Sequence, residues 1–279
     1  MFDLILGESG NLGRALLRVN QAPLISVPSE TSSTWQHDNS EQKIGRDLIN
    51  YGPDVRNIVI AIGVTNANTS PELMRRINVD LPLRVAKIAS ELGITTITFG
   101  TVAEFFSGKP NLYVKSKMDL YSSLEESGLL AQSVKHIRLH TLYGGLPSRS
   151  HMFVGQVVEA IRSRSEFRMT SGKQLREYHH VMEDAKMISK YIVSNISNPI
   201  VISHGNPLQL ADLASYLFRN FGSVKNLKIG ALRSDESENY DHIFPPSEFL
   251  NSSFSRSSIE EVGKYVEKQL ATEGNFFYE

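Results

Sequence analysis

The apolar residues of the first 145 positions alternate between short continuous runs and segments with helical spacing. Five runs have the length and composition of buried strands: 2–6, 24–27, 57–62, 94–99 and 134–139. After Gly13, over 70–92 and over 113–127, apolar residues instead return every three or four positions, as in a helix with one buried face. Strands that are apolar on both faces and alternate with helices are typical of a parallel sheet covered on both sides. The pattern predicts an α/β fold with a doubly wound parallel sheet, and polar turns over 28–42.

The pattern changes after Gly145. The rest of the chain has helical spacing in four places and one strand candidate, in the order 153–161, 183–194, the strand 200–203, 207–220 and 257–271. We therefore expect a first domain over 1–145 and a smaller C-terminal domain that takes up most of 146–279. Residues 176–204 are expected to return to the first domain.

Gly7, Gly10 and Gly13 have the spacing GxxGxxG and lie between the first strand and the first helix. The first glycine permits a tight turn, the second lets a pyrophosphate approach the backbone, and the third lets helix and strand pack closely. The N-terminus of the helix, with Asn11 and Leu12, then faces the anion. The motif predicts that 1–145 is a dinucleotide-binding domain of the Rossmann type.

The second strand candidate is followed by Pro28 and Ser29 and has no acidic residue at its end. A carboxylate in this place would bind the ribose hydroxyl of NAD and would repel the additional phosphate of NADP. Ser29, Thr31 and Ser32 can donate hydrogen bonds to that phosphate, although no arginine is adjacent. We therefore expect NADPH as the cofactor, with NADH as the alternative.

Tyr113 and Lys117 are four positions apart, which places them on one face of a helix. A nearby ammonium and a cationic nicotinamide ring would both lower the pKa of the phenol towards working pH. Such a tyrosine can pass a proton to a carbonyl oxygen while the cofactor delivers hydride, and Thr101 can hydrogen-bond the same oxygen. A surface tyrosine beside a solvated lysine has the same spacing. The catalytic interpretation of the pair is therefore favoured only because the pair follows the glycine motif.

With these motifs in this order, the chain resembles the extended short-chain dehydrogenases/reductases, also called the NAD-dependent epimerase/dehydratase family. The resemblance covers residues 1 to about 205. It rests on GESGNLG at 7–13, NIVIAIG at 57–63, NV at 78–79, FGT at 99–101, YVKSK at 113–117, IRLHTLYGG at 137–145 and REYHHVMEDA at 176–185. It implies that Thr101, Tyr113 and Lys117 are the catalytic residues.

The resemblance also implies a cofactor site and a substrate site. The cofactor would contact Gly7, Gly10, Asn11, Leu12, Gly13, Ser29, Ala61, Ile62, Gly63, Asn78 and Lys117. The substrate would contact Thr101, Tyr113, Thr141 and Arg176. Arg176 matches the arginine with which members that act on nucleotide sugars hold the diphosphate. Thr101 replaces the usual serine and keeps its hydroxyl, whereas Thr141 replaces a substrate-contacting asparagine.

Within the family, the chain is most similar to the nucleotide-sugar 4-ketoreductases, such as CDP-paratose synthase and dTDP-4-dehydrorhamnose reductase. Dehydratases of the family carry an acid pair where this chain has Val102 and Ala103, with Glu104 only third, which argues against dehydration. The resemblance implies NAD(P)H-dependent reduction of a keto group, at C4, on a nucleotide-diphosphate deoxysugar. An epimerase with tightly bound NAD is one alternative, and a non-catalytic NAD(P)-sensing regulator is another.

Composition excludes several other classes of function. With 29 Lys and Arg against 30 Asp and Glu, the chain lacks the positive charge that nucleic-acid binding requires. It has no cysteine, which excludes thiolate nucleophiles and fits a reducing cytoplasm. No apolar run reaches the roughly 18 residues of a membrane span. We expect a cytoplasmic enzyme without nucleic-acid or membrane partners, for which a homodimer is allowed.

Four further features leave alternatives open. His179 and His180 are adjacent, but no carboxylate or third histidine is spaced to complete a site; we expect no metal, with one histidine packed and the other exposed. Trp35 either stacks on an adenine or fills the core. The aromatic tail at 276–278 packs on the core or at a subunit interface. Arg162, Arg164 and Arg168 form a basic cluster. This cluster either lies at a solvated helix end or binds the diphosphate of a nucleotide.

Overall fold

The computed structural model describes residues 1–20, 22–66, 68–106, 108–196, 199–234, 238–247 and 259–271. The chain forms two compact units, each assembled from segments that are distant in sequence. Unit 1 consists of Met1–Glu104, Pro110–Leu139 and Ala185–Val201. Unit 2 consists of Phe105–Lys109, His140–Asp184 and Ile202–Glu279. The tail at 276–278 lies outside the described residues.

Unit 1 is built on a six-stranded sheet in which all neighbours are parallel. The order is β10-β5-β4-β3-β1-β2. The strands are β1 (Phe2–Leu6), β2 (Leu24–Ser26), β3 (Val55–Ile60), β4 (Thr95–Thr101), β5 (Val134–Leu139) and β10 (Ile200–Val201). The five apolar runs of the sequence correspond to β1 to β5. The predicted α/β fold with a doubly wound parallel sheet is confirmed.

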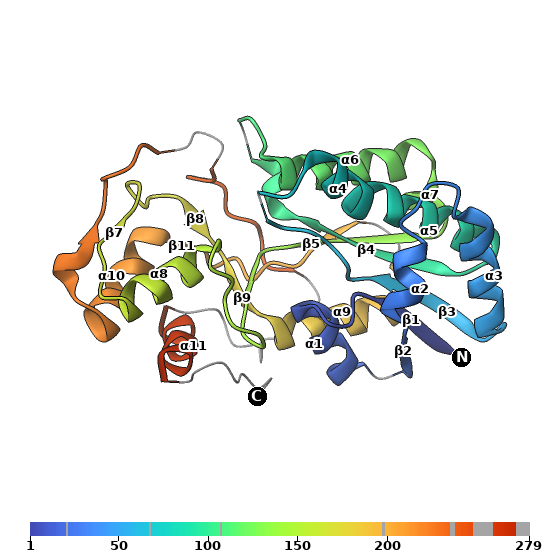
Figure 1. Ribbon diagram of the computed structural model, residues 1–279, viewed down its shortest axis with the longest axis horizontal. Coiled ribbons are helices and arrows are strands. Elements are labelled where there is room, and N and C mark those ends of the chain that lie inside the picture. Colours follow the sequence, from blue (N-terminus) through green and yellow to red (C-terminus); the bar gives the residue numbers. More distant parts are fainter. Residues whose placement is uncertain are drawn as a thin grey trace. The chain divides into compact units, whose positions relative to one another are not determined.

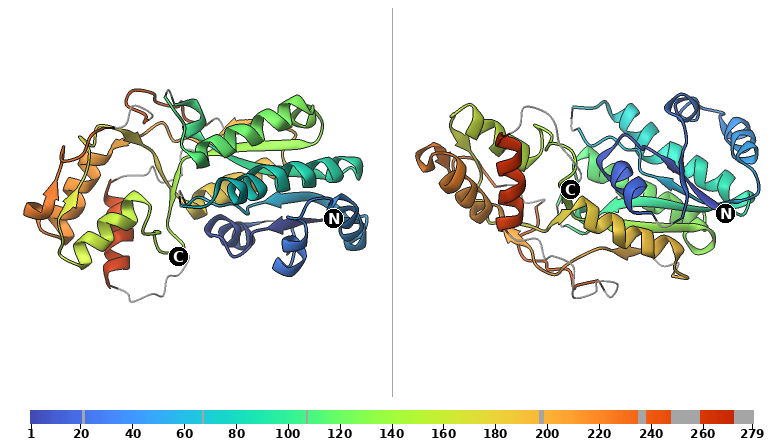
Figure 2. Two further views of the ribbon diagram at one scale, coloured as in Figure 1. Left: turned by 45° about the horizontal axis from the view of Figure 1, so that its top comes forward. Right: turned by 90° about the horizontal axis from the view of Figure 1, so that it is seen from below.

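Helices cover both faces of this sheet (Figures 1 and 2). One face carries α5 (Leu81–Glu91), α6 (Leu112–Glu126) and α7 (Leu129–Gln132), and the other carries α1 (Asn11–Val19) and the unit 1 part of α9 (Val181–Val193). The remaining helical elements of this unit are α2 (Ser29–Thr34), α3 (Glu41–Tyr51), α4 (Pro71–Arg75), η1 (Arg76–Asp80) and η2 (Val102–Phe105). On the face of α5, strand residues such as Leu4 and Ile58 pack with Ile44, Leu81 and Val85. This two-sided burial explains why the strands are apolar on both faces.

The segment at 28–42 is not the series of turns that its polarity predicts, because Ser29–Thr34 forms helix α2. Its hydroxyl groups donate back to carbonyl oxygens three residues earlier, as Thr34 Oγ1 does to Thr31 at 2.7 Å. Trp35 then enters the core fully buried, and its indole N–H donates to Asp47 at 2.7 Å. Tertiary burial therefore overrides the local polarity. Trp35 fills the core and does not present its ring to a ligand.

Unit 2 combines three helices with three two-stranded ladders. The helices α8 (Phe153–Arg162), α10 (Leu210–Phe221) and α11 (Ile259–Ala271) share a core that includes Val157, Leu213, Phe218 and Val262. Parallel ladders join β6 (Thr141–Tyr143) to β9 (Tyr178–His180) and β7 (Phe167–Arg168) to β12 (Leu227–Lys228). An antiparallel ladder joins β8 (Leu175–Arg176) to β11 (Leu208–Gln209). A short 3₁₀ helix, η3 (Val224–Asn226), precedes β12.

The division between the units differs from the expected one in position. The chain leaves unit 1 after Leu139, six residues before the change of pattern at Gly145, because 141–143 pairs with β9 of unit 2. The segment that returns to unit 1 is Ala185–Val201, which is shorter than the expected 176–204. Its strand β10 pairs with β5 at the edge of the sheet.

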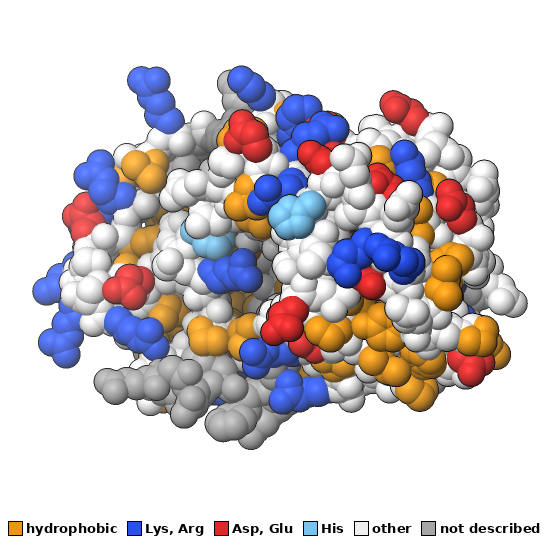
Figure 3. Space-filling view, turned by 45° about the vertical axis from the view of Figure 1, so that its right-hand side comes forward, with side chains coloured by type: hydrophobic (Ala, Val, Ile, Leu, Met, Phe, Trp, Pro, Cys, Tyr) orange, Lys and Arg blue, Asp and Glu red, His pale blue; other side chains and the backbone are white. Residues whose placement is uncertain are grey.

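The described surface carries charges of both signs. On the face shown in Figure 3, acidic side chains lie among the basic ones, which agrees with the net charge of -1. None of the helices in the described ranges is long and apolar enough to cross a membrane.

Candidate functional site

The glycine motif forms a turn at the carboxyl edge of the sheet, between β1 and α1. Gly7 has φ of +90°, and a Cβ on it would lie 2.4 Å from the backbone nitrogen of Ile62. A Cβ on Gly13 would lie 2.2 Å from the carbonyl oxygen of Gly7. Only glycine fits these two places, because any side chain would push the turn away from β3 or from α1.

The helix that follows this turn is suited to bind an anion. Gly10 is the N-cap of α1 and has no side chain to satisfy the first backbone N–H groups, and the first turn contains no acidic residue. Asn11 and Leu12 at the start of the helix are half-buried. N–H groups at a helix terminus and the positive end of the helix dipole favour a phosphate at this position. The residues therefore fit the pyrophosphate of a dinucleotide.

Two further loops complete this edge. Ala61, Ile62 and Gly63 follow β3 directly, and Ala61 donates its N–H to the carbonyl of Leu6 at 2.8 Å. Ser29 follows the end of β2 and is exposed. All three loops lie at the end of parallel strands where α/β proteins bind their ligands.

Asn78 holds the loop after β3 in place. Its amide oxygen accepts from the backbone N–H of Val64 at 2.8 Å, and its amide nitrogen donates to Val64 O at 2.8 Å and to Ser116 Oγ at 3.0 Å. Asn78 lies in η1, a π-helical turn, and is only 1% exposed. Because its amide bonds Val64, Asn78 holds the loop after β3 in place; the direct cofactor contact that the resemblance implies stays a prediction.

Helix α6 presents Tyr113 and Lys117. The side chain of Asn111 caps the helix by accepting from Val114 N at 2.9 Å, which fixes its first turn. Lys117 is 9% exposed, and its Nζ donates to the carbonyl of Phe99 at 2.8 Å. The same Nζ lies 5.9 Å from the centre of the Tyr113 ring. The predicted pair therefore shares one helix face, with the lysine anchored on β4.

The pKa of Tyr113 moves in the direction opposite to the one expected. Burial, and then the charge of Glu104, raise it to about 12. Burial lowers the pKa of Lys117 to about 8, although Glu104 partly opposes this shift. Desolvation and the carboxylate of Glu104 thus outweigh the effect of the ammonium on this pKa. Tyr113 is held as a neutral phenol, which can donate a proton.

Glu104 is a site residue that sequence reasoning noted only for its distance from Thr101. One carboxylate oxygen accepts from the backbone N–H of Thr101 at 2.7 Å, and the other accepts from Arg138 Nε at 2.7 Å. The side chains of Glu104 and Arg138 are 4% and 9% exposed. Because Glu104 also acts on the pKa values of Tyr113 and Lys117, it groups the three predicted catalytic residues around one carboxylate.

Thr101 ends β4, and its hydroxyl accepts from the N–H of Ala103 at 3.3 Å, so it keeps its own proton as a donor. Arg138 stacks on the ring of Tyr121 at 4.1 Å. Behind it, Thr98 Oγ1 hydrogen-bonds His136 at 2.8 Å, and burial lowers the pKa of His136 to about 3, with smaller contributions from Arg138 and Lys117. A neutral histidine therefore borders the cluster.

The predicted substrate residues fall in both units. Thr101 and Tyr113 belong to unit 1, whereas Thr141 and Arg176 belong to unit 2. Thr141 donates its backbone N–H to the carbonyl of Glu177 at 3.1 Å and is half-buried. Arg176 pairs with Glu238 and donates to the carbonyl of Leu175 at 2.9 Å. Its side chain is 23% exposed.

The basic cluster of unit 2 has partners within the protein. Arg162 donates to the backbone carbonyl of Gln269, and Arg168 lies 3.7 Å from Glu166. These contacts favour the interpretation of the cluster as the end of a helix on the surface.

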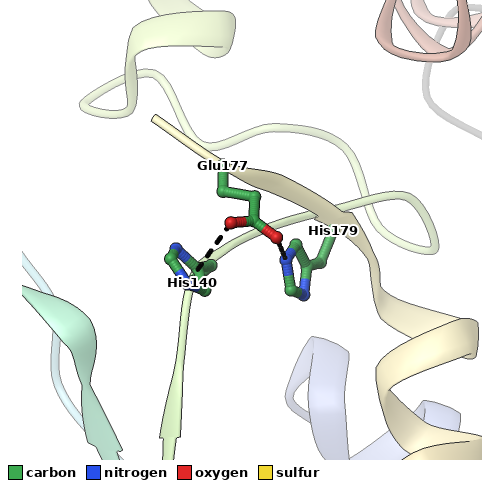
Figure 4. Close-up of side chains that lie close together, drawn as sticks. All are labelled: His140, Glu177 and His179. Atoms are coloured by element: carbon green, nitrogen blue, oxygen red, sulfur yellow. Dashed lines mark hydrogen bonds and ion pairs between the residues drawn. The ribbon is translucent and has the colours of Figure 1, made fainter. Parts of the chain in front are cut away.

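The two adjacent histidines lie in different surroundings. His179 is fully buried between Glu177 and Asp184, whereas His180 is half-buried beside Tyr143. The premise that no carboxylate or third histidine completes a cluster is wrong, because the structure places His140 beside Glu177 and His179 (Figure 4), and His204 beside His179 and Asp184. These contacts come from segments up to 64 residues apart, which sequence spacing does not reveal.

No protein-family model matches the chain, and no curated protein matches it. Solved structures match it over nearly its full length. A dTDP-glucose 4,6-dehydratase from Streptomyces venezuelae, solved with NAD bound, is 13% identical over 96% of each chain, with a TM-score of 0.76. A dTDP-4-dehydrorhamnose reductase from Yersinia enterocolitica is 18% identical over 95% of this chain and 98% of that one, with a TM-score of 0.69.

A UDP-N-acetylglucosamine 4-epimerase from Methanobrevibacter ruminantium is 13% identical over 97% of this chain and 98% of that one, with a TM-score of 0.73. At identities this low, the likeness shows the fold. The chain therefore has the fold of nucleotide-sugar dehydratases, reductases and epimerases, which confirms the fold implied by its resemblance to the extended short-chain dehydrogenases/reductases.

Proposed function

We propose that the protein reduces a keto group, at C4, on a nucleotide-diphosphate deoxysugar with NADPH or NADH. The observation that carries this proposal is the grouping of Thr101, Tyr113 and Lys117 around Glu104, at the sheet edge that also carries the glycine turn. Structures of the same fold include a dehydratase and a UDP-glucose 4-epimerase that were solved with NAD. Their likeness supports a nicotinamide cofactor in this chain.

The carboxyl edge of unit 1 would hold the cofactor. The turn from Gly7 to Gly13 and the N-terminus of α1 fit the pyrophosphate, and Ser29 at the end of β2 fits the adenosine ribose or its phosphate. Lys117 would hold the nicotinamide ribose with its ammonium. When bound, the reduced nicotinamide supplies the hydride. No acidic residue stands directly at the end of β2, and Glu30 comes only four residues later, which supports NADPH over NADH.

Tyr113 would supply the proton. As a phenol it can hydrogen-bond the keto oxygen and give up its proton as negative charge develops there, since an alkoxide is more basic than a phenolate. Thr101 would donate a second hydrogen bond to the same oxygen and so fix its position. The ammonium of Lys117 would stabilise the phenolate that remains, and the pair from Glu104 to Arg138 would keep β4 and its Thr101 in register.

The residues after Thr101 support reduction over dehydration. Val102 and Ala103 stand where a dehydratase of the family would carry an acid pair, and Glu104 is only third. Tyr113, whose pKa is raised to about 12, can donate the proton that reduction requires.

Unit 2 would bind the sugar nucleotide. Arg176 is partly exposed and would exchange its present partner Glu238 for the diphosphate. Thr141 would contact the sugar. A cytoplasmic location and a homodimer stay predictions.

The proposal is tested with nucleotide-diphosphate 4-keto-6-deoxysugars that carry different bases, each supplied with NADPH and with NADH. We expect oxidation of the reduced cofactor and formation of an equal amount of a sugar alcohol with one of these substrates. An epimerase would instead retain NAD through purification and interconvert two sugars without consuming added cofactor. A regulator would bind the dinucleotide and turn over none of the sugars. Either of these results would contradict the proposal.

A further inference from the structure

A cluster of polar side chains lies on one side of the short β6·β9 ladder in unit 2. In this ladder Thr141 pairs with Tyr178, so the preceding His140 lies next to Glu177, and Thr141 N donates to Glu177 O at 3.1 Å. Side chains two positions apart on a strand point to the same side, which adds His179 to Glu177. Figure 4 shows the result, in which the carboxylate of Glu177 directs one oxygen to each histidine.

The distances in this cluster are those of possible metal ligands. Glu177 Oε1 lies 2.8 Å from His179 Nε2, and Glu177 Oε2 lies 3.6 Å from His140 Nε2. Four ligands at the usual zinc distances of about 2.0–2.2 Å are separated by roughly 3.3–3.6 Å in a tetrahedral site. One ligand atom from each of the three residues lies within 4.8 Å of the others, so modest shifts of these side chains would bring them to such separations.

The polar atoms of the cluster are incompletely satisfied. The side chains of His140 and His204 are 6% and 3% exposed, and their Nε2 atoms have no hydrogen-bond partner among the described residues. The same holds for Oδ2 of Asp184, which is fully buried. Buried polar atoms in native proteins normally form hydrogen bonds, so three such atoms without one in the same place indicate a missing partner.

The charges of the cluster point to a cation as that partner. Glu177 and Asp184 are two buried carboxylates, and His179 is the one imidazole that bonds to both of them. Even if His179 carries a proton, one negative charge remains in a place with little access to water. A divalent cation would balance both carboxylates while all histidines stay neutral.

The cluster also has the outer contacts that metal sites use. His179 Nδ1 lies 2.9 Å from Asp184 Oδ1, and a donated proton there would leave Nε2 free to bind a metal. Histidine ligands of zinc are oriented by carboxylates in this way. Ser203 Oγ donates to Glu177 at 3.0 Å, and the N–H of His204 donates to the same carboxylate. These contacts hold the side chain of Glu177 in place.

We propose that His140, Glu177 and His179 bind one divalent transition metal ion, of the class of Zn²⁺, with Asp184 orienting His179. Two imidazoles and one carboxylate are a ligand set that suits zinc, with a water in the fourth position. Binding requires an unprotonated Nε2 on His179, so any proton on this atom is released to solvent. Because its ligands are buried, with His140 and Glu177 directly before β6 and β9 and His179 within β9, the ion would stabilise this ladder.

The test uses tag-free, full-length protein that has been stripped with a chelator and dialysed against Zn²⁺ in the presence of a weak competing chelator. We expect one zinc per chain by metal analysis, a higher melting temperature, and a return to the original value with strong chelator. Co²⁺ in place of Zn²⁺ should give the visible absorption of a tetrahedral site. Binding far below one ion per chain would overturn the proposal, and the cluster would then be a metal-free triad of Glu177, His179 and Asp184.

Variants locate the ion. His140→Gln should weaken zinc binding by at least about tenfold, and Asp184→Asn by about 10–100-fold, as expected for an orienting carboxylate. His37→Gln is the control, because His37 is exposed and contributes only its backbone carbonyl to a described contact. Unchanged binding in folded His140→Gln would overturn the proposal. Loss of binding in His204→Gln alone would do so too, because it would place the ion between Asp184 and His204.

If His140→Gln does not fold, the wild-type stoichiometry and the Co²⁺ spectrum still decide. Imidazole and carboxylate ligands give a spectrum that differs from that of hexahydrated Co²⁺. A spectrum that matches the hydrated ion would contradict a site built from these side chains.

Discussion

The two units differ in how they balance charge in their buried clusters. In unit 1, Glu104 meets Arg138 at 2.7 Å and lies near Lys117, so the described cluster has two cations for one carboxylate. In unit 2, His179 hydrogen-bonds both Glu177 and Asp184, while His140 and His204 lie 3.6 and 4.0 Å from these carboxylates, so the two carboxylates lie among imidazoles and no arginine or lysine is paired with either of them among the described contacts. The first cluster has a surplus of positive charge and the second a surplus of negative charge.

This difference suggests what each cluster is built to receive. A surplus cation beside a phenol suits a reaction in which negative charge passes to the phenol oxygen. A surplus of carboxylate among neutral histidines suits a metal ion. Burial is common to both clusters, so the sign of the uncompensated charge is the feature that separates them.

The largest expected effect comes from removing the proton donor in unit 1. Tyr113→Phe should lower kcat by about 10²–10⁴-fold, because general acid catalysis contributes an effect of this size. NADPH binding, followed by fluorescence, should change little. Thr101→Val should be milder, because it removes a hydrogen bond and leaves the proton source.

Tyr51→Phe, on α3, serves as the control for loss of a phenol hydroxyl. If Tyr113→Phe keeps more than a tenth of the wild-type kcat on a keto-sugar substrate, Tyr113 is not the acid.

One neutralising substitution in each unit tests whether the two buried clusters differ in their charge balance. Glu104→Gln removes the carboxylate that Arg138 contacts at 2.7 Å and should lower the free energy of unfolding by about 3–5 kcal/mol. Asp184→Asn in metal-free protein removes a surplus charge and leaves the Glu177–His179 pair balanced, so its cost should be clearly smaller. Urea unfolding measures both. An equal or larger cost for Asp184→Asn would mean that the contrast between the clusters is false.

A pH dependence of stability should arise from Lys117. Its pKa in the folded protein is lowered to about 8 from 10.5, so between these values the unfolded chain binds more protons than the folded one. The free energy of unfolding should therefore rise with pH across this window, by about 3 kcal/mol relative to Lys117→Met. Lys115→Met, on the exposed side of the same helix, is the matched control. A flat difference between wild type and Lys117→Met from pH 8 to 10.5 would show that the ammonium is well solvated.

The smallest effect concerns Arg176 in unit 2. Hydrogen bonds to a charged group contribute about 1.5–3 kcal/mol, so Arg176→Ala should raise KM for the sugar nucleotide by roughly ten- to a hundredfold. NADPH binding should be nearly unchanged. Glu238→Gln sharpens the test, because it frees Arg176 from its ion pair and should lower KM or leave it unchanged. A similar rise in KM for both variants would mean that the pair is structural.

Local features of unit 1 were predictable from the sequence. The strands, the glycine turn and the Tyr–Lys pair are encoded within a few residues of each other, as in the i, i+4 spacing of Tyr113 and Lys117. Helix α2 was missed because its stability depends on the buried Trp35 that follows it and not on its own polar residues.

Contacts between distant segments were not predictable. Glu104 meets Arg138 because β4 and β5 are neighbours, with Thr101 paired to Leu139. His140 meets Glu177 because the chain leaves β5 and pairs in parallel with β9. Neither register can be derived from spacing along a single sequence. The same limit applies to the pKa of Tyr113, whose direction depends on burial and on Glu104.

The transfer of deuterium from the cofactor tests the central claim most directly. The protein is incubated with a nucleotide-diphosphate 4-keto-6-deoxysugar and with NADPH that carries deuterium at its reactive carbon, and the product is examined by mass spectrometry and NMR. If the protein is the proposed reductase, deuterium appears at C4 of the sugar in an amount equal to the NADPH consumed, and Tyr113→Phe slows its appearance. A product formed without deuterium from the added cofactor would contradict the account.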